Sequence, residues 1–199
     1  MLEKLREKTS VIDFDEEKHE YSIGGQKLPG VTTILKRCGI IDTKWFTEGG
    51  MENGKRRHYL TELYDKGTLD WSTISEEDMP YLQAWILYLK DFRPKVVAME
   101  EVLYHKDLLY CGTADRLTDE NGEYVFIDLK SGAPLVWHNL QLILYGLAFE
   151  SLVGIRPKLR CVYLKKNGKY AYKDYDYKDE LVALSAVRID RWKTLNGKK

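Results

Sequence analysis

The stretches Cys111-Gly-Thr-Ala-Asp115 and Phe126-Ile-Asp-Leu-Lys130 decide the fold of this chain. Each lies in a run rich in β-branched and aromatic residues, which favours a β-strand. Between the two runs stands Asn121-Gly122, a pair that fits the two central positions of a type I′ turn. The sequence therefore predicts an antiparallel hairpin whose two strands carry these stretches.

The turn also predicts the register of the hairpin. It pairs Glu120 with Glu123, and counting back along both strands places Asp115 opposite Asp128. Because side chains i and i+2 of a strand share a face, Lys130 points the same way as Asp128. Facing carboxylates destabilise a sheet by up to about 1 kcal/mol, and by more when buried, unless a cation lies between them.

A divalent cation is the simplest partner for this pair, since carboxylate oxygens suit Mg²⁺ or Mn²⁺. Lys130 is then placed to orient or help deprotonate an attacking water, or to stabilise charge that develops on phosphorus. The alternative is that Asp115 and Asp128 are solvated carboxylates and Lys130 an ordinary ion-pair partner. A lone Asp-x-Lys tripeptide, taken by itself, favours that alternative.

The rest of the chain adds helices and further strands in a definite order. We expect a single domain over residues 1–199, opened by an N-terminal β-ribbon within residues 1–30. Its fold class is predicted to be α/β, with a central mixed, mainly antiparallel sheet flanked by helices. Helices are expected over Met51–Lys66, Ser75–Phe92, Val136–Leu152 and Leu181–Leu195, and strands over Val11–Phe14, Glu20–Ile23, Val96–Tyr104, Tyr110–Leu117, Tyr124–Leu129, Leu159–Lys165 and Lys169–Tyr175.

Composition excludes several classes of protein. The 31 Lys and Arg residues balance 31 Asp and Glu residues, so bulk charge does not draw the chain to nucleic acid or membrane, and a polyanion must meet a local positive patch. Three widely spaced cysteines without a CxxC pair argue against a disulfide framework or a zinc ribbon and favour a reducing cytoplasm. Neither a secretory signal nor a membrane span is expected.

Four motifs occur in a recognisable order: Gly54-x-x-x-His58, Gly112-x-x-Asp115, Asp128-x-Lys130 and Gln141-x-x-x-Tyr145. Together they resemble the PD-(D/E)xK nuclease superfamily, and specifically its RecB-like, phage-type exonuclease branch. The resemblance implies a restriction-endonuclease-like core, with residues 96–165 as the catalytic core.

The resemblance also implies the roles of individual residues. His58, Asp115, Asp128 and the backbone carbonyl of Leu129 would bind the metal, and Lys130 would be the catalytic lysine. The cofactor would be Mg²⁺ or Mn²⁺, and an imidazole ligand suits Mn²⁺ better. Without the other motifs, His58 would be interpreted as a polar-face or satisfied core histidine of its helix.

Three further positions complete the predicted catalytic set. Glu100 is preferred over Glu101 as the acidic residue near the metal, although a shift of one residue in a strand exchanges the two faces. Gln141 and Tyr145 lie four residues apart on one helix face and would brace the site and touch substrate phosphate. In the alternative, Tyr145 belongs to the core and Gln141 is a hydrogen-bonded polar edge.

The phosphate of a substrate requires local positive charge. Lys55, Arg56 and Arg57 immediately precede His58 and are predicted to bind substrate together with Gln141 and Tyr145. Clusters of this kind are more often solvated surface.

The function implied by the resemblance is divalent-metal-dependent DNA exonuclease activity that hydrolyses phosphodiester bonds, in phage or prophage recombination or repair. The alternatives are a structure-specific endonuclease of the same fold and a non-catalytic DNA-binding or assembly module. The implied partners are DNA and a separate single-strand annealing or helicase protein, and a homo-oligomer is a hypothesis. Such a protein would act in the cytoplasm of a bacterial host.

Overall fold

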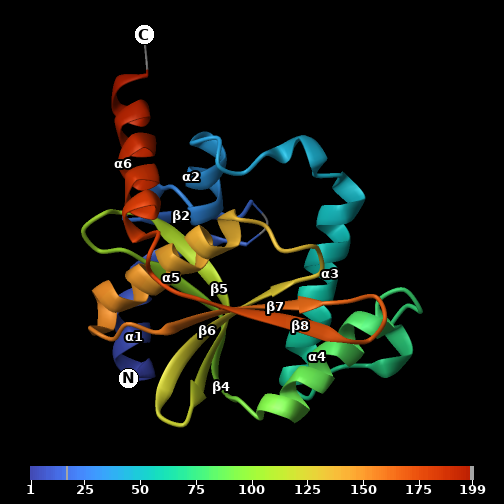
Figure 1. The fold of residues 1–199 in the computed structure, drawn as a ribbon. Coiled ribbons are helices and arrows are strands. Elements are labelled where there is room, and N and C mark those ends of the chain that lie inside the picture. Colours follow the sequence, from blue (N-terminus) through green and yellow to red (C-terminus); the bar gives the residue numbers. More distant parts are fainter. Residues whose placement is uncertain (17, 198–199) are drawn as a thin grey trace.

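The computed structural model describes residues 1–16 and 18–197, and it is a mixed α/β structure (Figure 1). Within these residues the α-helices are α1 (Leu2–Thr9), α2 (Val31–Arg37), α3 (Glu48–Asp65), α4 (Met79–Phe92), α5 (Trp137–Val153) and α6 (Glu180–Asn196). The strands are β1 (Ile12–Asp15), β2 (Glu20–Ile23), β3 (Gln26–Leu28), β4 (Lys95–Tyr104), β5 (Cys111–Glu120), β6 (Glu123–Lys130), β7 (Lys158–Leu164) and β8 (Tyr170–Tyr175).

The central sheet has the strand order β4-β5-β6-β7-β8. Its pairs are antiparallel except for β6 and β7, which run parallel and are joined by α5. This arrangement confirms the predicted mixed, mainly antiparallel sheet flanked by helices. A helical crossover is what a parallel pair requires, because a tight turn cannot join two strands that run in the same direction.

The hairpin of β5 and β6 forms in the predicted register. Glu120 pairs with Glu123, and the turn residues Asn121 and Gly122 both have positive φ, of 58° and 87°. That backbone conformation is the one a type I′ turn requires. The ladder of paired residues continues to Arg116 and Ile127, one position short of the two aspartates.

Side chains of β6 alternate between two hydrophobic layers. Phe126 packs in the larger layer together with residues of α5, α2 and α6, whereas Val125, Ile127 and Leu129 pack in a smaller layer with Trp85 of α4. Figure 1 shows α5 and α6 on one side of the sheet and α4 on the other. Asp128 and Lys130 share the parity of Phe126, so they face α5.

The N-terminal region differs in part from the prediction. The ribbon occupies β1 to β3, within residues 12–28, and is preceded by α1, which the sequence analysis did not predict. Leu5 is the buried residue of α1, and a helix of only eight residues depends on packing against the rest of the fold. The ribbon is joined to the central sheet where Cys111 N–H donates to the Pro29 carbonyl over 2.9 Å.

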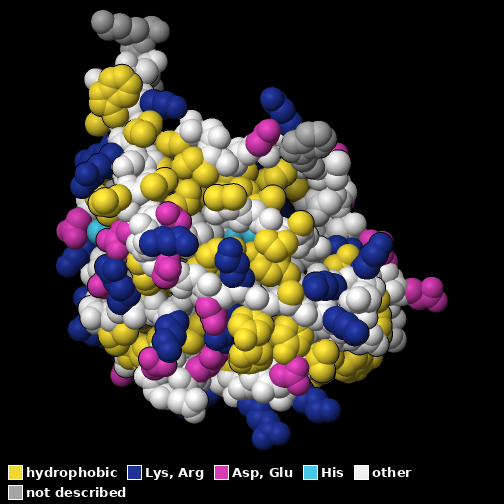
Figure 2. All heavy atoms as spheres, in the orientation of Figure 1, with side chains coloured by type: hydrophobic (Ala, Val, Ile, Leu, Met, Phe, Trp, Pro, Cys, Tyr) yellow, Lys and Arg dark blue, Asp and Glu magenta, His cyan; other side chains and the backbone are white. Residues whose placement is uncertain are grey.

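Charges of opposite sign are mixed over the surface. Figure 2 shows Lys and Arg interspersed with Asp and Glu on the visible face, with hydrophobic side chains along the protruding helix α6. Those exposed residues of α6 are Leu181, Val182, Ile189, Trp192 and Leu195. In the described part of the chain, no helix is both long and apolar enough to cross a membrane.

Candidate active site

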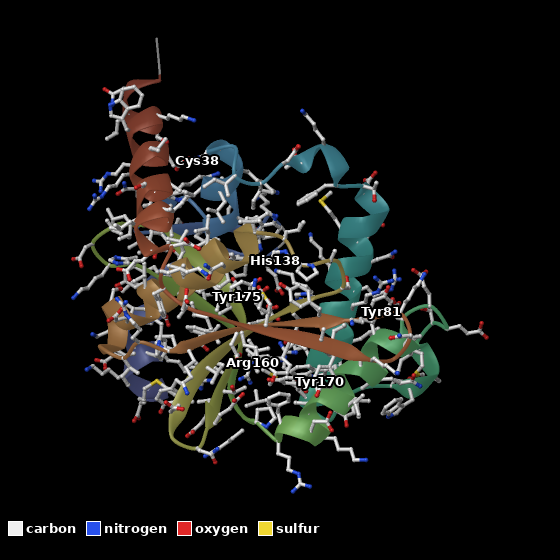
Figure 3. The ribbon with its side chains drawn as sticks, viewed as in Figure 1. Cys38, Tyr81, His138, Arg160, Tyr170 and Tyr175 are labelled. Atoms are coloured by element: carbon white, nitrogen blue, oxygen red, sulfur yellow. The ribbon has the colours of Figure 1, made fainter. Side chains whose placement is uncertain are left out.

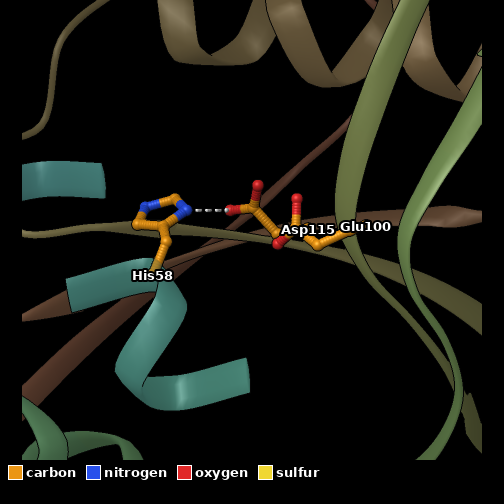
Figure 4. Close-up of side chains that lie close together, drawn as sticks. All are labelled: His58, Glu100 and Asp115. Atoms are coloured by element: carbon orange, nitrogen blue, oxygen red, sulfur yellow. Dashed lines mark ion pairs between the residues drawn. The ribbon is translucent and has the colours of Figure 1, made fainter. Parts of the chain in front are cut away.

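Three side chains from three elements converge at one point beside the central sheet. His58 comes from α3, Glu100 from β4 and Asp115 from β5, and their ligand atoms all lie within 4.8 Å of one another (Figure 4). The Nδ1 atom of His58 lies 3.4 Å from Oδ2 of Asp115. The structure thus brings together residues that are far apart in sequence, and it selects Glu100 over Glu101 for this cluster.

The backbone holds each of these side chains in place. Glu100 has a φ of 47°, which is unusual for a residue other than glycine and costs about 1–3 kcal/mol. Asp115 accepts a hydrogen bond of 2.7 Å at Oδ2 from the backbone N–H of Leu129, which ties β5 to β6 where the ladder of paired residues ends. His58 lies within α3, whose first turn is capped by the Thr47 side chain.

Next to the cluster, a chain of polar contacts runs from β6 to α5. Lys130 Nζ lies 2.6 Å from Oδ2 of Asp128 and donates to Oε1 of Gln141 over 3.1 Å. Gln141 in turn donates through Nε2 to the Tyr145 hydroxyl over 2.8 Å. Both ends of the buried glutamine amide are therefore satisfied, and this residue and Tyr145 hold the ammonium group of Lys130 in one position.

Gly112 makes room for this arrangement. A Cβ atom at this position would lie 2.4 Å from Cε1 of Tyr145 and 3.2 Å from Cγ2 of Val31. The tyrosine ring therefore rests directly on the backbone of β5. The glycine of the Gly112-x-x-Asp115 motif is required by this close approach, since its φ is not in the left-handed region.

Burial and neighbouring charges shift the pKa values of the side chains in and beside the cluster. Burial, followed by the charge of Asp115, raises the pKa of Glu100 to about 7. Burial likewise raises the pKa of Asp128. Burial acts in the same direction on Asp115, but the charge of His58 outweighs it and holds the pKa of Asp115 below the usual range. Burial would lower the pKa of Lys130, but the Asp128 carboxylate outweighs it and raises that pKa, so Lys130 is a charged ammonium group.

A buried arginine contacts Glu100 and Asp115 of the cluster, and it was not predicted from the sequence. Arg116 is fully buried; its Nε lies 2.7 Å from Asp65, and its Nη1 lies 3.3 Å from Glu100 and 2.7 Å from the Asp115 carbonyl. Trp85 also donates to Asp65. Its place in the sequence could have indicated this role, because Arg116 follows Asp115 inside a predicted strand, and a buried charge requires buried partners.

The cluster opens into a cavity of about 560 Å³. Its walls include the predicted residues of the cluster and of the Lys130 contact chain, together with residues of the N-terminal ribbon such as Phe14 and His19. On the ribbon side, the Tyr21 hydroxyl lies 2.9 Å from Oγ1 of Thr113, a residue of the Gly112-x-x-Asp115 motif. No role was predicted from the sequence for Tyr21 or Thr113.

The three basic residues before His58 separate in space. Lys55 lines the cavity of the cluster. Arg56 and Arg57 both bind the buried carboxylate of Asp78, and the guanidinium of Arg57 also stacks 3.6 Å from the ring centroid of Tyr81. Figure 3 shows Tyr81 on the side of the molecule where α3 and α4 lie. A phosphate-binding role remains a prediction for all three basic residues.

The donor set fits a divalent cation. Two carboxylates and one imidazole converge. Burial and then the charge of Asp115 raise the pKa of Glu100, and a bound cation would offset both effects. Asp128 lies beside this set, with its Oδ2 atom bound to Lys130. A direct bond from Asp128 or from the Leu129 carbonyl to the metal remains a prediction.

Residues 51–196 match the sequence model of the PD-(D/E)XK nuclease superfamily. The chain belongs to this nuclease superfamily. The match covers the cluster, the Lys130 contact chain and the whole central sheet, and it confirms the predicted family. PD-(D/E)XK nucleases use divalent metals. A comparison with curated proteins found no matching sequence.

Solved structures with a similar fold include a protein described as “Putative exonuclease” from Eubacterium rectale. It is 10% identical to this nuclease, with 87% of this chain and 77% of that chain covered and a TM-score of 0.53. An alkaline exonuclease from Laribacter hongkongensis is 13% identical, with 81% and 75% covered and a TM-score of 0.42. The first likeness agrees with the fold assigned to this PD-(D/E)XK nuclease.

Proposed function

We propose that this nuclease is a divalent-metal-dependent exonuclease that hydrolyses DNA phosphodiester bonds. The observation that carries the proposal is the convergence of His58, Glu100 and Asp115 beside the Asp128–Lys130 pair in one open cavity. His58, Glu100 and Asp115 would hold Mg²⁺ or Mn²⁺. When bound, the cation supplies a Lewis acid for the phosphoryl oxygen and for the attacking water.

The protein's own residues would position the substrate and neutralise its charge. Lys130, held by Asp128 and Gln141, directs its ammonium group at the cavity and would donate to a phosphoryl oxygen or to the attacking water. Because the Asp128 carboxylate raises the pKa of Lys130, its ammonium form is favoured, and that form would stabilise the charge that develops on the phosphoryl oxygens. The water oxygen bonds to phosphorus as the bond from phosphorus to the 3′ oxygen breaks. The attacking water gives up a proton to solvent and the leaving 3′ oxygen takes one up from solvent, so the products are a 5′-phosphate and a 3′-hydroxyl.

The exonuclease mode and the biological setting are the finer part of the proposal. They are supported by the motif order in the sequence, and a fold neighbour carries the name of an exonuclease. We propose a role in phage or prophage recombination or repair in a bacterial cytoplasm. A single-strand annealing or helicase protein as partner would be detected by co-purification, and light scattering would reveal a homo-oligomer.

The test is cleavage of matched linear and closed circular DNA by the purified protein in Mn²⁺ or Mg²⁺. Linear DNA should be shortened from its ends, and the circle should stay intact. Lys130→Met and Asp128→Asn should lower the rate by about 100- to 1,000-fold. The matched control is Lys90→Met, which changes an exposed lysine on α4 and should leave the rate unchanged.

Three results would overturn parts of the proposal. Cutting of the closed circle would assign an endonuclease instead. Cleavage by Lys130→Met at the wild-type rate, with the variant folded by circular dichroism, would remove the assigned site. Metal-independent DNA binding without cleavage would support a non-catalytic module.

A further inference from the structure

A second cavity, of about 460 Å³, opens beside His58 and Lys130. These two side chains line both cavities, so the two spaces meet at the candidate active site. Unlike the first cavity, the second contains none of the three carboxylates of Glu100, Asp115 and Asp128 in its lining. It will be called the apolar cavity, after its side chains Phe46, Met51, Leu135 and Trp137.

The walls of the apolar cavity come from three segments. Met51 lies in the first turn of α3, Leu135 in the loop after β6 and Trp137 at the start of α5. Met51 is 48% exposed and Leu135 is 45% exposed. Uncovered apolar side chains that line a cavity beside polar groups are typical of a ligand site.

Apart from Lys130 and His58, which it shares with the first cavity, the apolar cavity offers polar groups that are neutral or already paired. His138, near the centre of Figure 3, accepts a hydrogen bond of 3.3 Å at Nδ1 from the Leu135 N–H, so the hydrogen of its neutral ring is on Nε2. Burial, followed by the charge of Lys130, lowers the pKa of His138 to about 3. Arg57 lines the cavity too, but its guanidinium is bound to Asp78.

The position of the apolar cavity relative to Lys130 favours a nucleobase as the ligand of the cavity. Nζ of Lys130 lies 5.6 Å from the ring centroid of Trp137. A phosphate held at Lys130 therefore places the nucleoside attached to it beside an aromatic ring and three apolar side chains. Nucleobases bind such surfaces by stacking, whatever their sequence.

We propose that the apolar cavity binds one unstacked nucleobase of the substrate strand while the phosphate of that nucleotide lies at the cluster. This inference rests on the proposed nuclease function and names its substrate class. A base inside a duplex is covered on both faces by its neighbours, so a base in this cavity must have left the stack. The preferred substrate is therefore a single strand or an end with at least one unpaired base.

The test measures binding to single-stranded oligonucleotides that each lack one base at a different position. Fluorescence anisotropy in Ca²⁺ gives the dissociation constants, and a gel of the same samples verifies that the strands stay intact. Wild type should bind the strand that lacks the critical base about 5- to 150-fold more weakly than the complete strand. Trp137→Ala and Leu135→Ser should bring that ratio close to one.

Trp192→Ala is the matched control, because Trp192 is 65% exposed on α6 and does not line the cavity. It should keep the wild-type ratio. Equal binding of all strands by wild type, or a wild-type ratio in both Trp137→Ala and Leu135→Ser, would overturn the inference, and so would absence of any binding. Cleavage of complete and base-lacking strands at equal rates would refute the base site and leave the nuclease function standing.

Discussion

Gly112→Ala tests whether the buried contacts of α5 position Lys130, although Gly112 does not line the cavity of the cluster. The new Cβ would lie 2.4 Å from Cε1 of Tyr145, so the ring must move by about 1 Å to reach ordinary contact. The 2.8 Å bond from Gln141 to the Tyr145 hydroxyl would then exceed hydrogen-bond range. Gln141 would lose the partner that holds it against Lys130.

Two effects are expected. Overpacking of this kind costs about 1–3 kcal/mol, which for a chain of this length lowers Tm by about 2–12 °C in a thermal melt. Misplacement of the lysine by about 1 Å should lower kcat on linear DNA by about 100-fold, with a smaller change in KM. Both follow from the position of one methyl group.

Gly49→Ala is the matched control, because a Cβ there meets nothing within 4 Å and its φ is not positive. This change in the first turn of α3 should leave kcat unchanged and stabilise the helix by up to about 1 kcal/mol. If Gly112→Ala has the Tm and kcat of wild type, the contact between Tyr145 and β5 does not position Lys130, and this prediction is wrong.

Three further predictions concern stability. Arg116→Met leaves the buried Asp65 carboxylate without a cationic partner and should lower the unfolding free energy in urea by about 3–5 kcal/mol. Arg156→Met, at a partly exposed arginine, should lower it by less than about 1 kcal/mol, and similar losses in the two variants would contradict this. Mn²⁺ at about 100 times its Kd should stabilise wild type by about 2.7 kcal/mol and raise its Tm by about 5–10 °C, but it should leave the Tm of Asp115→Asn unchanged. A wild-type Tm that Mn²⁺ does not change would argue against a metal at the cluster. Because folding lowers the pKa of His138 to about 3, its contribution to stability is complete above the unfolded pKa and is lost as pH falls from about 6.5 toward 3. Unfolding free energy should therefore fall by up to about 1.4 kcal/mol more per pH unit in wild type than in His138→Gln, and parallel pH profiles would refute this.

Local patterns in the sequence were enough to predict the central hairpin and most elements around it. Asn121-Gly122 specifies its own turn type, and that turn fixes which residues of β5 and β6 face each other. The same holds for Gln141 and Tyr145, because their spacing on a helix needs no knowledge of the rest of the fold. The parallel pairing of β6 with β7 follows from the helix between them.

Contacts between distant segments were beyond the reach of the sequence. Arg57 looked like a phosphate ligand, yet its guanidinium binds Asp78, a partner on another segment. The choice between Glu100 and Glu101 depended on a backbone with positive φ inside β4, and no periodic pattern reports such a conformation. Helix α1 was missed because it is only eight residues long and has one buried residue, Leu5.

The central claim is that His58, Glu100 and Asp115 hold the metal of a nuclease site. It is tested most directly by diffraction from a crystal soaked in Mn²⁺, recorded at the manganese absorption edge. The account predicts an anomalous peak among the imidazole of His58 and the carboxylates of Glu100 and Asp115, with Lys130 still bound to Asp128. Manganese bound elsewhere on the protein with no peak among these three side chains would contradict it.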